Sequence, residues 1–238
     1  MKTLYLILVF LFGTLVSKSQ IHFSKFKSIK YRTVPIQGGS LLDDSTKFDI
    51  IDLSKIPSLK DTKIYLQHIK GDSSNILVYK KSKLVQTIGV PFWFWLIENV
   101  CYVADFDNNK KADIKFTIEG DGAGLAGELA HKIYLFNNGN KFKLLTFFDF
   151  SHEKEYDLNN DGTFEILSCN HVFLGGHSYW AYNAFSFANG RLKNVSQKIG
   201  YPLWTKHLFK SSNIIATNIS MNERNKEYRS LPDSTLIK

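Results

Sequence analysis

The sequence predicts an all-β protein, a small β-propeller-like array of four-stranded antiparallel repeats with a period of about 52 residues. Three observations lead to this prediction. Apolar and polar residues alternate in short runs, an acidic loop pattern occurs twice at an offset of 52 residues, and no stretch of ten residues has a convincing helical period. Repeats of this kind stack, because one repeat alone cannot cover its own apolar faces.

The first 19 residues are predicted to be an export signal. Lys2 supplies positive charge, residues 4–16 form an apolar stretch too short to span a bilayer, and Ser17 and Ser19 fit a signal peptidase site. No cysteine lies near that site, so we expect no lipid anchor. The expected location is the periplasm, the cell surface or the medium; the alternative for this segment is a buried N-terminal helix.

The distribution of basic residues along the chain disfavours nucleic-acid binding. The net charge is +8 at neutral pH, and about +6 would remain after loss of the signal. The basic residues are scattered and accompany no nucleic-acid-binding motif, and no second apolar stretch is long enough to cross a membrane. The oligomeric state is left open.

The remaining chain is expected to hold a polar segment at 20–46, a β-repeat domain at 47–221 and a polar tail at 222–238. Two Asn-Gly pairs, at 138–139 and 189–190, are typical of tight hairpin turns. A third hairpin is expected at 76–86, without an acidic loop before it. The alternation predicts strands at 47–53, 62–69, 75–80, 83–90, 92–102, 112–119, 130–136, 141–150, 163–173, 178–187, 191–200 and, more weakly, 213–219.

The first candidate site is the loop at 157–165, whose oxygen-bearing residues recur at every second position. They are Asp157, Asn159, Asp161, Thr163 through its carbonyl, and Glu165. Hard divalent cations take six or more oxygen ligands, and Gly162 suits the sharp turn of such a loop. We therefore predict a Ca²⁺ site between two strands, with a plain Asn- and Asp-rich turn as the alternative.

The second candidate site, 105–113, repeats this pattern 52 residues earlier. Its expected ligands are Asp105, Asp107, Asn109, the carbonyl of Lys111, and Asp113, while Lys110 replaces the glycine. Either a second cation or an ordinary turn is compatible with this sequence. In both loops the expected role of the ion is structural, because its binding energy adds to the stability of the fold.

A glycine-rich segment follows each acidic loop, at 120–127 and at 175–176. Because the two glycine-rich loops occupy equivalent positions in their repeats, we expect them on the same rim of the domain. Loops held by a rigid scaffold often form binding sites. Tyr179 either faces the partner or only closes a turn. The predicted partner-binding residues are Gly175, Gly176, His177, Ser178 and Tyr179.

Residues 105–195 resemble the calcium-loop repeats of FG-GAP/VCBS-type proteins. The loop at 157–162, followed by Gly175, Gly176 and Tyr179, is also similar to small secreted β-propeller-like proteins related to periplasmic lysozyme inhibitors of the invertebrate type. The resemblance implies a calcium-stabilised module without catalytic activity. In those inhibitors a Ser-Gly-x-x-Tyr loop enters the lysozyme cleft, and here Gly175 stands where the serine would be.

The expected function is therefore an exported, calcium-stabilised, non-catalytic module that presents its Gly-rich loops to a protein or glycan. One alternative is an inhibitor-like protein that inserts residues 176–179 into a glycosidase cleft. Another is a carbohydrate-active enzyme that uses the loop carboxylates of Glu119, Asp121 and Glu128. The histidines show no zinc spacing, and no nucleophile or phosphate-loop motif is present, so an enzyme is not expected. The spacing of Cys101 and Cys169 leaves a disulfide open.

Overall fold

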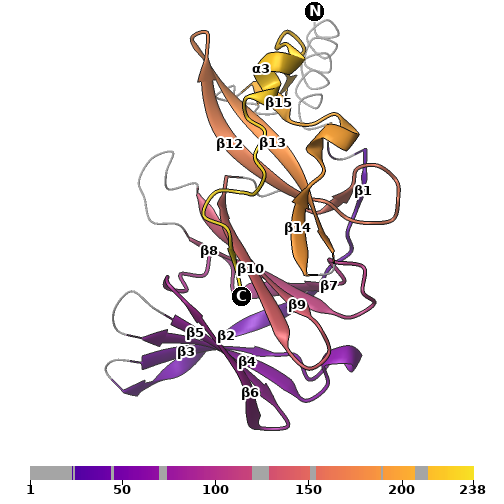
Figure 1. Ribbon diagram of the computed structural model, residues 1–238. Helices are drawn as coiled ribbons and strands as arrows, with labels where there is room; N and C mark the ends of the chain where they lie inside the picture. The colour runs from indigo at the N-terminus through magenta and orange to yellow at the C-terminus, as the bar shows by residue number, and fades with distance from the viewer. Residues whose placement is uncertain are drawn as a thin grey trace, which may run out of the picture. The chain divides into compact units, whose positions relative to one another are not determined.

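The computed structural model of the protein describes residue 23 and residues 25–43, 46–69, 74–119, 129–150, 154–188, 190–206 and 214–238. The regular structure in these ranges is mainly β-strand, with short helical elements such as α3 (Met221–Asn225) (Figure 1). The all-β prediction is confirmed. The predicted export signal lies outside the described residues. Within the described ranges, no helix has the length and apolar character needed to span a membrane.

The chain divides into two compact units. The sheet unit comprises residues 29–150, 187–192 and 231–238, and the hairpin unit comprises residues 1–28, 151–186 and 193–230. Each unit is assembled from separate parts of the chain, and the expected domain at 47–221 contributes to both.

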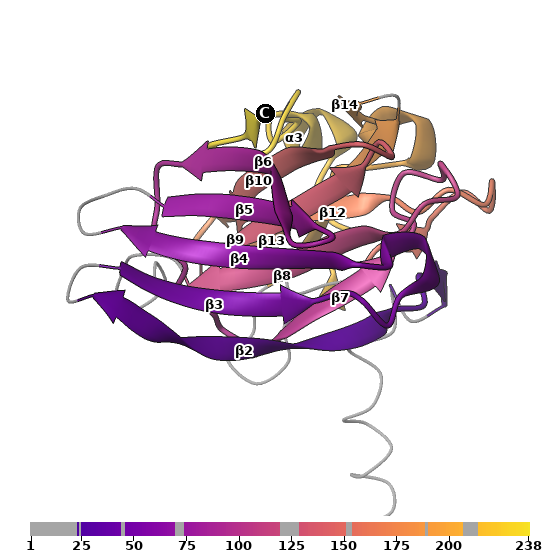
Figure 2. The same ribbon diagram turned by 90° about the horizontal axis from the view of Figure 1, so that it is seen from below.

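The sheet unit contains one antiparallel sheet of ten strands that curls into a half-barrel. Figure 2 shows five of its strands, β2 to β6, side by side in chain order. The order across the sheet is β17-β10-β9-β8-β7-β2-β3-β4-β5-β6. The strands are β2 (Arg32–Asp43), β3 (Thr46–Asp52), β4 (Thr62–Ile69), β5 (Ser74–Lys80), β6 (Lys83–Val90), β7 (Val100–Ala104), β8 (Asp113–Glu119), β9 (Ala130–Asn137), β10 (Phe142–Asp149) and β17 (Leu236–Ile237).

Burial along these strands explains why the sequence forms them. In β4 every second side chain is buried, starting at Thr62, as expected where one face of a strand packs on the core. In β9 all eight residues are buried, so this strand is covered on both faces. The core includes Ile51, Ile64, Leu66, Ile76, Ile114, Phe116, Ile133, Leu135 and Leu144.

The hairpin unit is built on a long hairpin of β12 (Ile166–Leu174) and β13 (His177–Ala188). Its sheet has the order β12-β13-β15-β16, with β15 (Leu203–Lys206) and β16 (Ile214–Ile215), and β14 (Arg191–Asn194) also pairs with β13. The short strands β1 (Lys27–Ser28) and β11 (Tyr156–Asp157) pair with each other.

Several expected element boundaries are wrong. The predicted strand at 191–200, for example, ends at Asn194 and is followed by a 3-10 helix at Ser196–Ile199. The segment before residue 47 was expected to be irregular, but β2 runs from Arg32 to Asp43 because Val34 and Ile36 alternate into the core. The expected strand at 92–102 begins only at Val100. Before it, residues 91–99 are irregular apart from a single bridge between Leu96 and Ile118.

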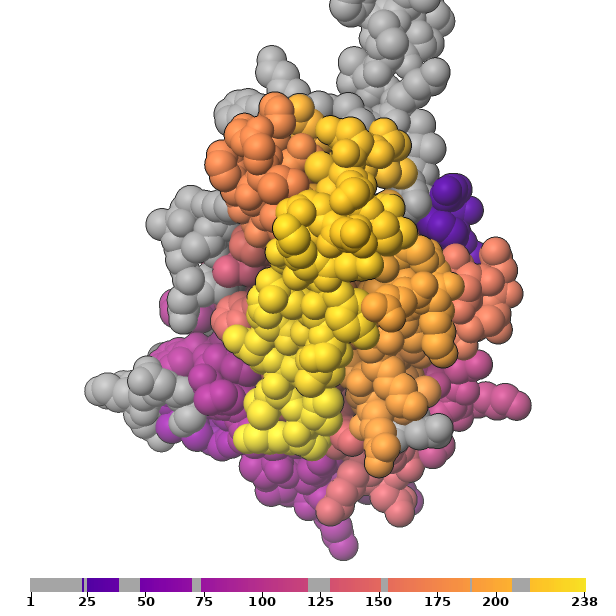
Figure 3. All heavy atoms as spheres, turned by 45° about the horizontal axis from the view of Figure 1, so that its top comes forward, coloured from indigo at the N-terminus to yellow at the C-terminus, as the bar shows by residue number. Residues whose placement is uncertain are grey.

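The end of the chain also has more structure than its polar composition suggests. Leu236 and Ile237 pair with β10, and the Nζ of Lys238 donates a hydrogen bond to the Gly89 carbonyl at 2.7 Å. Figure 3 shows this end of the chain in yellow, beside earlier parts of the chain in purple. The tail therefore extends the sheet at one edge. Cys101 and Cys169 are both buried, and no disulfide joins them.

Candidate metal-binding loops

The loop at 105–113 connects two neighbouring strands, β7 and β8. Ala104 and Asp113 are paired across these strands, so the loop closes directly on the end of the ladder. The corresponding residues of the other loop, Tyr156 and Glu165, form the same antiparallel bridge. Both loops thus span eight residues between a pair of bridged neighbours, as expected for a repeated element.

The side-chain oxygens of loop 105–113 accept hydrogen bonds from the backbone of the same loop. Asp105 accepts from the N–H groups of Asn109 at 3.0 Å and Lys110 at 2.8 Å. Asp107 accepts from Asn109 at 3.2 Å, and Asn109 accepts from Lys111 at 2.8 Å. These bonds curl the backbone so that alternate side chains turn toward one space.

Three of these four bonds recur at corresponding positions in loop 157–165. Asp157 accepts from the N–H of Gly162 at 3.1 Å. Asn159 accepts from Asp161 at 3.0 Å, and Asp161 accepts from Thr163 at 2.7 Å. Two sequences that share few residues therefore adopt one backbone arrangement, because the side-chain oxygens sit at the same places.

The backbone torsions also agree between the loops. The fourth residues, Asn108 and Asn160, have φ values of 58° and 59°. The sixth residues, Lys110 and Gly162, have φ values of 65° and 85°. Glycine reaches this left-handed region at little cost, whereas lysine does not, so loop 105–113 carries strain at Lys110 that loop 157–165 avoids.

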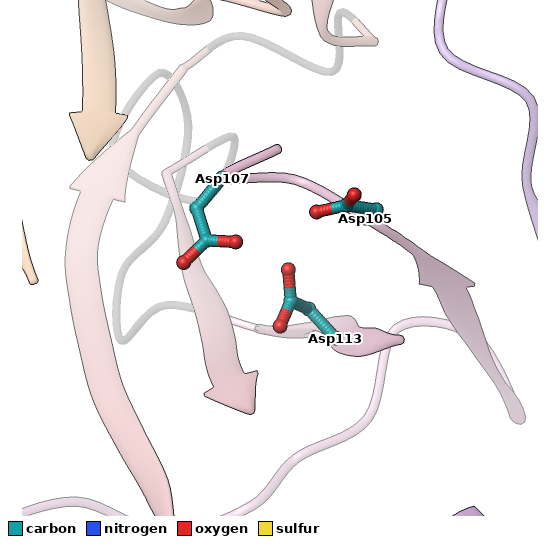
Figure 4. Close-up of side chains that lie close together, drawn as sticks. All are labelled: Asp105, Asp107 and Asp113. Carbon is teal, nitrogen blue, oxygen red and sulfur yellow. The ribbon is translucent and has the colours of Figure 1, made fainter. Parts of the chain in front are cut away.

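Loop 105–113 brings three carboxylates together. One oxygen each from Asp105, Asp107 and Asp113 lies within 4.8 Å of the others, and Figure 4 shows the three groups converging. Burial, together with the nearby Asp107 carboxylate, raises the pKa of Asp113 to about 7, although N–H groups of Asn137 and Phe106 oppose this shift. Burial also raises the pKa of Asp107, with a smaller contribution from Asp105. The three carboxylates therefore form one acidic cluster.

The acidic side chains of loop 157–165 differ from those of loop 105–113 in their burial. Asp157 and Glu165 are buried, whereas Asp161 is exposed and its pKa is lowered by the Thr163 N–H. Burial, followed by the Asp161 and Asp157 carboxylates, raises the pKa of Glu165 to about 7. Asp157 Oδ1 is buried and has no hydrogen-bond partner in the described part of the chain. An acceptor buried in this way costs free energy unless a donor or a cation reaches it.

These donors suit a hard cation. Both loops offer carboxylate and amide oxygens, which are the ligands that Ca²⁺ takes, and neither places a histidine or cysteine among them. The carbonyls of Thr163 and Lys111 occupy the seventh positions. All ten residues predicted as ligands therefore lie in two loops of one design, and the close carboxylate cluster forms in the loop without the glycine.

The predicted partner-binding residues lie at the turn between β12 and β13. Gly175 and Gly176 are exposed with φ values of 56° and 76°, and His177 is exposed beside the Lys206 ammonium. Ser178 is half-buried. Tyr179, however, is 3% exposed and packs against Trp204, with ring centroids 5.6 Å apart.

Neither interpretation of Tyr179 matches its position, because it lies inside β13 and is buried. Its ring belongs to a small core with Ala181, Trp204 and Ala216, so it is not presented to a partner. The exposed aromatic residue of this hairpin is Phe173, at 70% exposure, which the sequence marks only as the end of a predicted strand.

Only some of the residues considered for catalysis lie in the described part of the chain. Asp121, Glu128 and His152 lie outside the described residues. His177 belongs to the hairpin unit, whereas Glu119 and His131 belong to the sheet unit. Glu119 and His131 nevertheless line one hollow of about 400 Å³, together with Phe92, Trp93 and Trp95. The signal that could have located it is the aromatic run at 92–95, which we interpreted as a buried strand.

In comparisons with known proteins, no family model, no curated protein and no solved structure matches the chain.

Proposed function

We propose that this chain is an exported, calcium-stabilised β-protein without catalytic activity, which binds a protein or glycan partner. The observation that carries the calcium part is the buried Asp157 Oδ1, which lacks a hydrogen-bond partner among the described residues. A cation held by Asp157, Asn159, Asp161, Glu165 and the Thr163 carbonyl would compensate this oxygen. The oxygen-only donor set favours Ca²⁺, which accepts more protein ligands than Mg²⁺ does.

Loop 105–113 supports a second ion. Its three clustered carboxylates repel one another, and a divalent cation between them would turn this repulsion into attraction. Bound calcium would supply charge neutralisation and a link between the two ends of each loop. The loops themselves supply the backbone curl, because the side-chain to backbone hydrogen bonds hold it.

We further propose that the two loops mark a repeat of four antiparallel strands, as in small propeller-like arrays. The orders β7-β8-β9-β10 and β11-β12-β13-β14 support this, since each begins with a strand, an acidic loop and a second strand. In each, the third and fourth strands form a hairpin around an Asn-Gly pair.

The test is a thermal melt of the purified protein in excess chelator, followed by addition of calcium. We expect calcium at about 100 times its dissociation constant to raise the melting temperature by about 5–10 °C. Asp157→Asn is expected to reduce this rise, and Asp233→Asn, the same change at an exposed site outside both loops, is expected to leave it unchanged. A wild-type melting temperature that calcium does not change would contradict the proposal.

A further inference from the structure

The sheet unit has a hollow of about 400 Å³ that the acidic loops do not use. Its wall includes Phe92, Trp93, Trp95, Ile118, Glu119 and His131. This volume lies within the range of small-molecule sites, which combine an apolar wall with a few polar groups. The composition of this wall follows that description, since three aromatic rings stand beside one carboxylate and one imidazole.

The aromatic side of the hollow is held in place by the backbone. Phe94 is buried in the core, and the next residue, Trp95, exposes 62% of its surface. The carbonyl of Trp95 accepts a hydrogen bond from the N–H of Glu119 at 2.6 Å, and Leu96 bridges to Ile118. The exposed indole is therefore attached to a fixed segment and not to a free loop tip. Such exposure of a large aromatic side chain leaves apolar surface in water, which favours a ligand that would cover it.

The polar side of the hollow offers both kinds of hydrogen-bonding group. Glu119 is exposed at the end of β8, and its side-chain oxygens can accept hydrogen bonds. His131 is mostly buried, and the centroid of its ring lies 4.5 Å from the centroid of the Phe92 ring. An indole N–H donates, whereas the Nδ1 of His131 lies 3.5 Å from the Thr146 hydroxyl, so the donor that we assign to the ligand is the indole. A ligand that satisfies this wall needs donors and acceptors around an apolar face.

We infer that this hollow binds a neutral sugar unit of an oligosaccharide. One face of a pyranose ring carries C–H groups that can cover the indole of Trp95, because the face of an aromatic ring is electron-rich. The hydroxyl groups around the ring both donate and accept, so they can donate to the Glu119 carboxylate and accept from an indole N–H. A quaternary ammonium ion would also be attracted to the indole and the carboxylate, but it has no group that hydrogen-bonds the wall.

This inference rests on the proposed role as a binding module and names its partner class, but it does not depend on calcium. The hollow contains none of the residues of the two acidic loops. The calcium melt and the sugar titration described next can therefore fail separately, and each failure identifies the proposal that is wrong.

The experiment is a titration of the purified protein, followed by tryptophan fluorescence and by calorimetry. The probes are cellotetraose, maltotetraose and tri-N-acetylchitotriose, with tetramethylammonium chloride as the cationic probe. We expect at least one oligosaccharide to bind and to change the fluorescence. Trp95→Ala is expected to weaken binding about tenfold, and Glu119→Gln to weaken it by a similar factor, about tenfold, because a charged acceptor is lost.

The matched control is Phe173→Ala, which removes another exposed aromatic ring from the hairpin unit. It is expected to leave sugar binding unchanged, and all three variants are expected to melt as the wild type does, since Trp95, Glu119 and Phe173 are exposed. The inference is overturned if no probe binds, if only tetramethylammonium binds, or if Trp95→Ala binds the sugar as tightly as the wild type.

Discussion

Asp113 and Glu165 occupy the same place in two loops and make the same hydrogen bond. Asp113 accepts from the N–H of Phe106 at 2.9 Å, and Glu165 accepts from the N–H of Leu158 at 2.8 Å. In both cases the donor is the second residue of the loop and the acceptor is the ninth. Each carboxylate therefore closes its loop while remaining buried, and burial raises the pKa of each to about 7.

This dual role predicts opposite effects for two substitutions at Glu165. Glu165→Gln keeps an oxygen for the Leu158 N–H and removes a buried charge, so we expect the chelated protein to be as stable as the wild type or more stable. Glu165→Ala leaves that N–H without its acceptor and is expected to cost about 1–3 kcal/mol. Urea unfolding in chelator measures both values. Equal destabilisation by the two variants would contradict the role of Glu165 as the acceptor of the Leu158 N–H. Both variants are expected to reduce the stabilisation by calcium.

The raised pKa values of Asp113 and Glu165 predict how stability changes with pH in the absence of calcium. The folded protein holds these protons more tightly than the unfolded chain, whose pKa values are near 3.8 and 4.5. The stability they contribute is fully present below those values and is lost as the pH rises through about 7. We therefore expect the melting temperature in chelator to fall between pH 5 and pH 8.

Calcium should reverse this trend, because it binds the ionised carboxylates and competes with protons below pH 7. The stabilisation by calcium is thus expected to be larger at pH 8 than at pH 5.5. The control is the double variant Asp113→Asn, Glu165→Gln, whose melting temperature in chelator should vary less over the same range. A calcium effect that is larger at pH 5.5 would count against the carboxylate site.

The sequence was informative where local chemistry decides the structure. The two loops could be predicted because oxygen-bearing residues at alternate positions bond the local backbone, whatever lies around them. The hairpins at Gly139 and Gly190 follow from turn chemistry in the same way, and both glycines have positive φ. These features need no knowledge of distant contacts.

Other features depended on partners far away in the sequence. No strand was predicted for residues 32–43. They form a strand between β3 and β7 because Val34 and Ile36 pack in the core. Tyr179 could not be assigned to core or surface until Trp204 was placed beside it. The aromatic run at 92–95 was predicted to lie in a strand. In the structure, Phe94 is buried in the core and Trp95 is exposed.

The two buried cysteines predict a protein with unreactive thiols. Burial raises the pKa of Cys101 to about 12, so the thiol stays protonated at pH 8 and the reactive thiolate is scarce. Cys169 is also buried. We expect neither to react quickly with a thiol reagent in the native protein and two to react after unfolding in urea without reductant. An unfolded, unreduced protein with no reactive thiol would indicate a disulfide instead.

The difference between Lys110 and Gly162 predicts that loop 105–113 can be improved. Lys110 has a φ of 65° and adds a positive charge to an acidic loop, whereas Gly162 occupies the same position with a φ of 85°. Lys110→Gly removes both the strain and the charge, and it keeps the backbone N–H that bonds Asp105 at 2.8 Å. Lys110→Ala removes the charge alone. We therefore expect the glycine variant to exceed the alanine variant by about 1 kcal/mol in free energy of unfolding.

The charge at this position is exposed, so its effect on calcium should be modest and sensitive to salt. Both Lys110 variants are expected to bind calcium about three times more tightly than the wild type at low ionic strength, and the gain should shrink at high salt. Gly162→Ala serves as the reverse test, because it introduces the strain into the other loop and should cost about 1 kcal/mol. If Lys110→Gly and Lys110→Ala proved equally stable, the positive φ would carry no strain and the two loops would differ in charge alone.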